Sequence, residues 1–304
     1  MSLNLFNTYK KQFNIKMHDI INEYVENKDI KERIFYCLEN GKRLRPIISI
    51  DICLKLGYKI DDVIKVALAI ELIHNSSLII DDFPCMDDDH FRRGKPSFHK
   101  KYSIGEGQII AQYIINLAFK LINDNFKNYN KNLSLLIENI CKNLGILGVA
   151  GGQLIDASPL QFGSNKQDII NNNNKNQNKK EKIEDLFMKK TCSLFEIAFL
   201  TGFLSGNGNH DNINVLLKAA RDFGMAFQIY DDFDDIEQDK KRVDMNLYDP
   251  NYINNFGKDK AFSKFKLSLN NFKKNMNNLQ LYSSVMDQLY NFLDSGVKNK
   301  INNI

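Results

Sequence analysis

The sequence predicts an all-α fold, a single-domain bundle of about ten or more helices. Three observations support this prediction. Apolar residues recur at three- and four-residue spacing along most of the chain, as they do on one face of a helix. No segment shows the alternation of a half-buried strand, and no βαβ unit is visible. With 304 residues, the chain is long enough to bury a large helical core.

The N-terminal part contains the first expected helices. Residues 6–24 carry an apolar stripe, and a short second helix follows around Leu38. Asn40 and Gly41 should end that helix, and Pro46 suits the first turn of the next one. The cations near this junction therefore lie on a loop or at a helix start, where backbone N–H groups also attract anions.

The next long helix is expected to run from Asp61, as its N-cap, to about Asp82. It is apolar almost all round, which predicts a central position among other helices. Pro84 should end or kink this helix, because proline lacks a backbone N–H and its ring clashes with the preceding turn. The bend would allow Asp87 to fold back towards Asp81.

Helical periodicity continues to the end of the chain. The further expected helices lie within residues 109–126, 133–149, 183–200, 215–236 and 259–297. Between about 165 and 182 the composition changes to Asn, Lys and Gln, which predicts a poorly ordered insertion loop that the core tolerates.

Composition excludes several classes of protein. The 41 basic and 37 acidic residues nearly balance, so no global field favours a nucleic-acid partner. The five cysteines form no CxxC pair, which is typical of reduced thiols. No N-terminal signal sequence is apparent, and the most apolar run, residues 63–80, contains charged residues. We therefore expect a cytoplasmic protein without a transmembrane segment.

Two acidic clusters follow largely apolar helices. Residues 81–89 contain five carboxylates, and residues 231–235 contain four. Like charges about 4 Å apart repel by roughly 4 kcal/mol at an effective dielectric near 20, so a fold concentrates them only in solvent or around a cation. Asp231 and Asp235 lie about 40° apart around a helix, which lets them converge on one ion. Two such helices facing each other would bring six carboxylates to a central cavity.

A hard divalent cation is the expected counter-charge. Carboxylates and water are Mg²⁺ ligands, and the spacing of an EF-hand calcium loop is absent. Mg²⁺ often shares its coordination with substrate phosphates. The neighbouring cations suit phosphate oxygens, and they are Lys42, Arg43, Arg45, Arg92, Arg93 and Lys95. No Walker-type glycine loop is present, which disfavours a nucleotide triphosphatase.

In their order and spacing, these motifs resemble those of the trans-isoprenyl diphosphate synthase family. The matching motifs are residues 41–46, 77–82, 92–99, 151–153, 190–191 and 227–232. The resemblance covers nearly the whole chain. It implies an isoprenoid synthase fold around a central active-site cavity, a homodimer, and Mg²⁺-dependent condensation of isopentenyl diphosphate with an allylic diphosphate. The expected allylic substrates are dimethylallyl, geranyl and farnesyl diphosphate.

The resemblance also implies the metal ligands. The direct ligands would be Asp81, Asp87 and Asp231, and the further ligands or water-holding residues would be Asp82, Asp232 and Asp235. Three Mg²⁺ ions are expected with substrate bound, with Mn²⁺ as the alternative ion. By neutralising the leaving diphosphate, the ions would favour ionisation to an allylic cation.

The remaining site residues follow from the same resemblance. Those expected to bind isopentenyl diphosphate are Lys42, Arg45, His74 and Arg93. Those expected to bind the allylic diphosphate are Arg92, Lys190 and a lysine after the second cluster, Lys240 or Lys241. Thr191 and Gln228 match positions whose oxygens face the developing cation. The proton lost at the end is expected to go to the released diphosphate.

The sequence departs from the family pattern at two places. Ile80 stands where members often have His before the first aspartate pair, and residues 236–242 replace the usual Gly-Lys element. The positions four and five before Asp81 are Ser77 and Ser76, both small, and a small residue there leaves room for a long chain. The four-residue gap between Asp82 and Asp87 resembles that of farnesyl and geranylgeranyl synthases with the longer first motif. The small Ser76 then favours a geranylgeranyl (C20) product, with farnesyl diphosphate as the alternative.

Two other functions compete with this interpretation. A terpene cyclase shares the metal chemistry but needs no second diphosphate site, so Lys42, Arg45 and Arg93 argue against it. A non-catalytic regulatory subunit of a synthase heteromer would be expected to have lost aspartates, and both clusters are intact.

Overall fold

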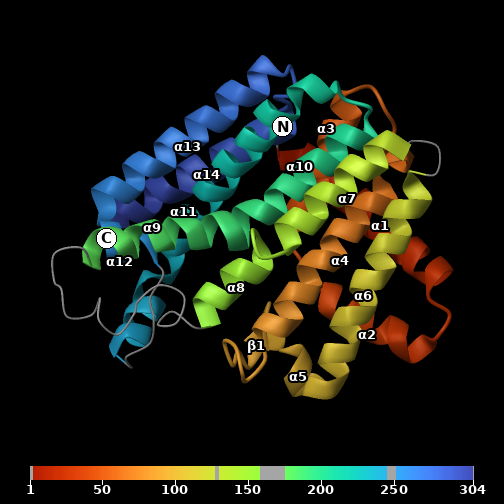
Figure 1. Ribbon diagram of the computed structural model, residues 1–304, viewed down its shortest axis with the longest axis horizontal. Coiled ribbons are helices and arrows are strands. Elements are labelled where there is room, and N and C mark those ends of the chain that lie inside the picture. The colour runs from red at the N-terminus through yellow and green to blue at the C-terminus, as the bar shows by residue number, and fades with distance from the viewer. Residues whose placement is uncertain (1–2, 127–129, 158–174, 245–250, 304) are drawn as a thin grey trace. The chain divides into compact units, whose positions relative to one another are not determined.

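The computed structural model of the chain describes residues 3–126, 130–157, 175–244 and 251–303 (Figure 1). Within these ranges nearly every element is helical, and the helices α1 to α14 confirm the expected all-α fold of ten or more helices. The chain divides into two compact units, residues 1–137 with 198–208, and residues 138–197 with 209–304. That both belong to a single domain stays a prediction.

The first unit consists of N-terminal helices and one short hairpin. Its elements are α1 (Leu3–Tyr24), α2 (Lys28–Leu38), α3 (Leu44–Lys55), the 3₁₀ turn η1 (Ile60–Asp62), α4 (Ile64–Asp81), β1 (Phe91–Arg92), β2 (Lys95–Pro96), α5 (Phe98–Lys101) and α6 (Ile104–Asn125). α7 (Asn130–Leu144) begins in this unit, and α10 (Ser193–Ser205) ends in it.

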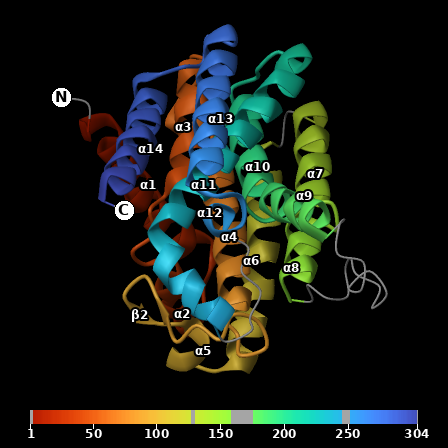
Figure 2. The same cartoon turned by 90° about the vertical axis from the view of Figure 1, so that its left-hand side faces the viewer.

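Helix α4 is the core of this unit, as its apolar composition predicts. It lies against α6 and α3, and Figures 1 and 2 both show α4 beside α6. Most of its side chains are buried, including all of residues 66–70. A helix that is apolar on all sides can remove its apolar surface from water only when neighbouring helices surround it. The central position of α4 therefore follows from its sequence.

The start of α4 differs from the expectation. Asp61 is not the N-cap; a 3₁₀ turn precedes the helix, and Val63 occupies the cap position. Asp62 instead closes the turn by accepting a hydrogen bond from the Lys59 backbone N–H at 2.7 Å, while Asp61 pairs with Lys16 on α1. The Asp62 carboxylate thus caps the 3₁₀ turn, and neither Asp61 nor Asp62 caps α4.

The hairpin β1–β2 corrects the expectation that no strand occurs. Phe91 pairs with Pro96 and Arg92 with Lys95 in an antiparallel register. The two-residue loop has Arg93 at φ 54° and Gly94 at φ 79°, the backbone of a type I′ turn. Strands of two residues are too short to show an alternating pattern, so sequence periodicity misses them.

The second unit is built around the longest helix. Its further elements are α8 (Val149–Ala157), α9 (Lys175–Phe187), the π-helical turn η2 (Met188–Cys192), the 3₁₀ turn η3 (His210–Asn212), α11 (Ile213–Asp244), α12 (Tyr252–Phe256), α13 (Lys258–Asn278) and α14 (Ser284–Asn303). α11 packs against α13, η2, α12 and α14, and its contact with α13 is visible in Figure 2.

Two predicted boundaries in this unit are wrong. The helix expected over residues 133–149 is interrupted after Leu144 and restarts as α8. The insertion loop expected over about 165–182 is helical from Lys175, because Lys, Gln and Glu favour helix and Ile183, Leu186 and Phe187 bury one end of α9. The part of that loop before Lys175 lies outside the described residues.

One stretch of the described chain, Lys131–Ala157, is long and apolar enough to cross a membrane by length and composition alone. This stretch differs from residues 63–80, which the sequence pattern predicts to be the most apolar run. One such helix is weak support for a membrane span, and the absence of a transmembrane segment stays a prediction. All five cysteines are free.

Candidate active site

The first aspartate cluster sits at the C-terminal end of α4. The helix ends at Asp81, and the chain turns at Pro84 as predicted. The backbone N–H of Asp87 then donates to the carbonyl oxygen of Asp81 at 2.9 Å. The bend therefore returns Asp87 to Asp81, where helical rotation alone would not place it.

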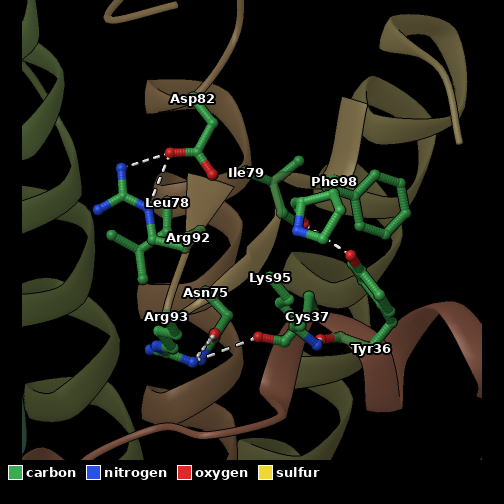
Figure 3. A pocket seen from close by; sticks show the side chains of 11 residues that line it. Tyr36, Cys37, Asn75, Leu78, Ile79, Asp82, Arg92, Arg93, Lys95 and Phe98 are labelled. Carbon is green, nitrogen blue, oxygen red and sulfur yellow. Dashed lines mark hydrogen bonds and ion pairs between the residues drawn. The ribbon is translucent and has the colours of Figure 1, made fainter. Parts of the chain in front are cut away.

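Asp82 has a different environment from its neighbour. It is 2% exposed, whereas Asp81 is half-buried and Asp87 is exposed. Its Oδ1 accepts hydrogen bonds from Nε of Arg92 at 2.8 Å and from Nη2 of the same guanidinium (Figure 3). Burial raises the pKa of the Asp82 carboxyl, and the Arg92 hydrogen bonds and charge act in the opposite direction. Asp82 thus ties the hairpin to α4.

Three of the four residues predicted to bind isopentenyl diphosphate lie close together. Nη1 of Arg45 is 3.3 Å from Nε2 of His74. The pKa of His74 lies well below its ordinary value, first because the ring is buried and then because Arg45, Arg93, Arg92 and Arg43 repel a proton. The neutral ring can therefore accept a hydrogen bond from Arg45.

Arg93 reaches the same region from the hairpin turn. Its Nη1 donates to Oδ1 of Asn75 at 3.1 Å and to the carbonyl oxygens of Cys37 and Glu39, as Figure 3 shows for Asn75 and Cys37. Burial lowers the pKa of Arg93. The fourth predicted residue, Lys42, is exposed at the end of the α2–α3 loop.

A small pocket lies between the hairpin and α4. Its lining includes Asp82, Arg92, Arg93, Asn75 and Cys37 (Figure 3). The internal volume of about 30 Å³ holds one or two water molecules and is too small for a diphosphate. Cys37 contributes no charge, because burial raises the pKa of its thiol to about 12.

Arg43 has a role that sequence reasoning missed. It was grouped with the anion-binding cations, but it is 5% exposed and donates to Glu71 Oε1 at 2.7 Å, to the Leu38 carbonyl and to Asn14. Its backbone is left-handed, at φ 63°. The signal that could have revealed this pair is Glu71, a lone acid in an apolar helix, which needs a buried partner.

The second aspartate cluster lies on α11. Asp231 is half-buried and Asp235 exposed, whereas Asp232 is 6% exposed. Oδ1 of Asp232 accepts from Nε2 of Gln228 at 2.8 Å, and Oδ2 accepts from the Tyr252 backbone N–H at 2.7 Å. In both clusters, the second aspartate of the pair is the buried one.

Lys190 and Thr191 lie in the π-helical turn η2, a feature that often marks functional sites. Lys190 donates to Asp156 on α8, a partner the sequence analysis did not assign. A Cβ at Gly152 would lie 2.8 Å from Cγ of Lys190, so glycine there permits the close approach of α8 to η2. Oγ1 of Thr191 donates to Oε1 of Gln228 at 2.5 Å.

The contact expected from a lysine after the second cluster stays a prediction. Lys240 and Lys241 lie in α11 but outside the residues whose side chains the structure describes. A different lysine reaches this helix from α14. Nζ of Lys300 donates to the Tyr230 carbonyl at 3.0 Å and pairs with Asp234 at 2.8 Å. No local sequence signal predicts that contact, because it depends on how α14 packs against α11.

Across the part of the chain that is described, no group of three or more His, Cys, Asp or Glu side chains is arranged to hold a metal ion. Carboxylates repel one another without a cation between them, so a preassembled cluster is not expected. Asp81, Asp87, Asp231 and Asp235 are half-buried or exposed hard oxygen donors, and this donor chemistry fits a divalent ion. Their predicted metal roles stay predictions.

These features place the chain among all-α proteins with paired aspartate motifs on helices. The profile of the family described as polyprenyl synthetase matches residues 27–250. The chain is 30% identical over 218 residues to geranylgeranyl pyrophosphate synthase 3, chloroplastic, of Arabidopsis thaliana, covering 70% of this chain and 57% of that one. It is 32% identical over 228 residues to the farnesyl diphosphate synthase of Bacillus subtilis (strain 168), covering 72% of each.

Among solved structures, an FPP/GFPP synthase from Zymomonas mobilis matches with a TM-score of 0.74 and 26% identity, over 98% of this chain and all of the other. The chain belongs to the polyprenyl synthetase family. It spans a little over half the length of the plant relatives it matches.

Proposed function

We propose that the protein is a Mg²⁺-dependent prenyltransferase that condenses isopentenyl diphosphate with an allylic diphosphate, either dimethylallyl, geranyl or farnesyl. The observation that carries this proposal is the pair of cations beside the half-buried ring of His74. Nη1 of Arg45 lies 3.3 Å from Nε2 of that ring, and, besides burial and Arg45, the charge of Arg93 also lowers the pKa of His74. Guanidinium groups beside this half-buried stripe of α4 are suited to a polyanion. The names of the relatives support the same reaction class.

In the proposed reaction, the C–O bond of the allylic diphosphate breaks and its electron pair leaves with the diphosphate. The double bond of isopentenyl diphosphate attacks the allylic carbon, and loss of a proton restores a double bond. The released diphosphate takes that proton. Oxygens of Thr191 and Gln228 face the developing cation, as acceptors that stabilise positive charge.

Different residues hold the two substrates in this proposal. Arg45, His74 and Arg93, with Lys42, position isopentenyl diphosphate, so that its double bond meets the allylic carbon. Arg92 and Lys190 bind the allylic diphosphate. Both are now paired with carboxylates, Arg92 with Asp82 and Lys190 with Asp156, so the diphosphate has to compete with those contacts.

The divalent ions would be held mainly by Asp81, Asp87 and Asp231, with Asp235 and the more buried Asp82 and Asp232 around them. When bound, Mg²⁺ supplies charge that neutralises the leaving diphosphate.

The proposed product is geranylgeranyl diphosphate. Along α4, His74, Ser77, Leu78 and Asp81 form a half-buried stripe at helical spacing. Ser76 lies off this stripe; it is 1% exposed and donates to the Ala111 carbonyl on α6 at 3.0 Å. The residue on the same face as Asp81, one turn earlier, is therefore Ser77. Because Ser77 is also small, it leaves room for a C20 chain, and Ser77 takes the place of Ser76 in this proposal.

The direct test is incubation of the purified protein with Mg²⁺, ¹⁴C-labelled isopentenyl diphosphate and each allylic diphosphate in turn, followed by chromatography of the dephosphorylated products. We expect elongation to C20. A cyclised hydrocarbon would indicate a terpene cyclase, and no product with any primer would indicate a non-catalytic subunit. Asp81→Ala and Asp231→Ala should each abolish elongation. Asp61→Ala, at an exposed surface pair, should not.

A further inference from the structure

The buried aspartate of the second cluster has an environment unlike that of a metal ligand. Asp232 is 6% exposed, and both of its carboxylate oxygens accept hydrogen bonds inside the second unit. Asp231, its neighbour, is half-buried. A helix turns by 100° per residue, so the two side chains leave α11 in different directions. Their chemical roles can therefore differ.

The contacts of Asp232 hold its carboxylate in one orientation. The Tyr252 backbone N–H binds Oδ2, and Nδ2 of Asn251 donates to the Asp232 backbone carbonyl at 2.8 Å. Asn251 is itself the N-cap of α12, where its Oδ1 accepts from two backbone N–H groups. Both residues are almost fully buried, Asn251 at 1% and Tyr252 at 3% exposure. The carboxylate thus has a rigid support on one side and Gln228 on the other.

This support dictates which way the Gln228 amide points. An ionised carboxylate accepts hydrogen bonds but cannot donate them. Gln228 must therefore turn its NH₂ group to Asp232, and its Oε1 towards Thr191. Thr191 then uses its only hydroxyl hydrogen to reach Oε1. The oxygens of both half-buried side chains are left with lone pairs and no outward hydrogen.

We propose that Asp232 is a positioning residue that fixes the direction of the Thr191–Gln228–Asp232 hydrogen-bond chain, so that the oxygens of Thr191 and Gln228, and not the Gln228 nitrogen, face the reacting carbon. The inference rests on the proposed function, in which an allylic cation develops near Thr191 and Gln228. Fixed acceptors stabilise that charge, whereas an N–H group pointed at it would destabilise it. In this role Asp232 acts through Gln228 and not by binding the metal.

The substitution Asp232→Asn tests the direction of the chain. Asn has nearly the same shape, but the Tyr252 N–H still needs an acceptor, so its Oδ1 stays there and its Nδ2 turns to Gln228. The Gln228 amide must then flip and present its NH₂ to Thr191. We expect kcat to fall by about 10²-fold, with the KM of both diphosphates and the Mg²⁺ concentration at half-maximal rate unchanged.

A double-mutant cycle separates this role from a metal-binding or purely structural one. In a Gln228→Leu background, Asp232→Asn should lower kcat by less than about twofold, because the Gln228 amide through which Asp232 acts is already absent. A multiplicative loss, or a rise of about tenfold or more in the half-saturating Mg²⁺ concentration, overturns the proposal. The matched control is Asp234→Asn, the same change at an exposed position of α11, which should leave kcat nearly unchanged.

A spectroscopic measurement tests the geometry without relying on activity. In protein labelled with ¹⁵N-glutamine, the Gln228 side-chain NH₂ signal can be assigned by its loss in Gln228→Leu. A proton donated to a carboxylate should appear downfield in the wild type and move upfield in Asp232→Asn. An ordinary shift in the wild type overturns the inference, even if Asp232→Asn fails to fold. If the shift is as expected but the wild type elongates no primer, the proposed function fails and the hydrogen-bond geometry stands.

Discussion

The pair of Arg43 and Glu71 shows at the residue scale how the first unit places its cations. The guanidinium joins α4, through Glu71, to the carbonyl oxygen of Leu38 at the end of α2. Both side chains are less than 5% exposed. Lys42 and Arg45 flank Arg43 in sequence, so this buried contact fixes the backbone from which both proposed diphosphate ligands project.

We predict that Glu71→Ala lowers the free energy of unfolding by about 3–5 kcal/mol, because it leaves a buried guanidinium unpaired. Urea unfolding followed by circular dichroism measures the change. Glu39→Ala removes the partner of Lys95 in a more exposed pair and should cost less than about 1 kcal/mol. Equal losses in the two variants would show that burial of the Arg43–Glu71 pair has no energetic consequence.

His74 gives a prediction about pH. Its pKa is lowered in the folded protein, by burial first and by Arg45 next, from an ordinary value of 6.5. In the unfolded chain His74 therefore binds a proton near pH 6.5, whereas in the folded protein it stays neutral at that pH. The free energy of unfolding falls as the pH drops below that value. Between pH 7.5 and 5.5, the wild type should lose about 1.4 kcal/mol more unfolding free energy than His74→Gln.

Unfolding both proteins in urea at the two pH values checks this prediction. All other titrating groups are shared, so their contributions cancel in the difference. An identical pH dependence in wild type and His74→Gln would mean that His74 protonates normally in the fold, against the charge environment described above.

At the scale of single elements, α4 connects the proposed diphosphate site to the proposed product chain. One face carries His74, Ser77 and Asp81, and the opposite side of the helix packs into the unit through residues such as Ser76. Two adjacent serines therefore have different surroundings, although the sequence makes them look equivalent.

We predict that Ser77→Phe shortens the product from C20 to C15 or C10, because a ring on the Asp81 face would block chain growth one turn before the aspartates. Ser76→Phe is the matched control. Its ring would meet α6 at Ala111, so it should lower the melting temperature through overpacking and leave the product length unchanged in the folded fraction. Radio-chromatography and thermal unfolding separate the two effects. Shortening by Ser76→Phe alone would show that Ser76, and not Ser77, sets the length of the product.

The elements themselves were largely predictable from local patterns. Apolar spacing located the main helices, and Pro84 located the bend that returns Asp87 to Asp81, since both signals act within a few residues. Local patterns did not predict side-chain contacts with residues that are distant in the sequence. The hydrogen bond between Asp232 and the Tyr252 backbone, 20 residues away, could not be predicted, because it depends on how α12 packs. The Arg43–Glu71 pair was missed for the same reason. The metal role that the family resemblance implies for Asp232 stays a prediction.

At the scale of the whole molecule, the surface keeps large apolar side chains in contact with water. On α6, Ile104 is 48% and Ile109 67% exposed. Ile109 borders a surface hollow. Its lining is partly apolar, with Ile30, Ile110 and Tyr113, and partly polar, with Asn27, Asp29, Arg33 and Glu106. Exposed apolar side chains that are rimmed by polar residues are typical of a surface covered by a partner. The homodimer implied by the family resemblance is the partner we propose.

We predict that the protein elutes at twice the 35.2 kDa chain mass in size-exclusion chromatography with light scattering. Ile109→Lys should reduce the mass to that of one chain, because burying a charged ammonium group in the interface removes its hydration and opposes association. Ile15→Lys makes the same change on α1, at a side chain that is 55% exposed, and should leave the dimer intact. A monomeric wild type would exclude the homodimer, whereas a dimer that survives Ile109→Lys would place its interface away from this face of α6.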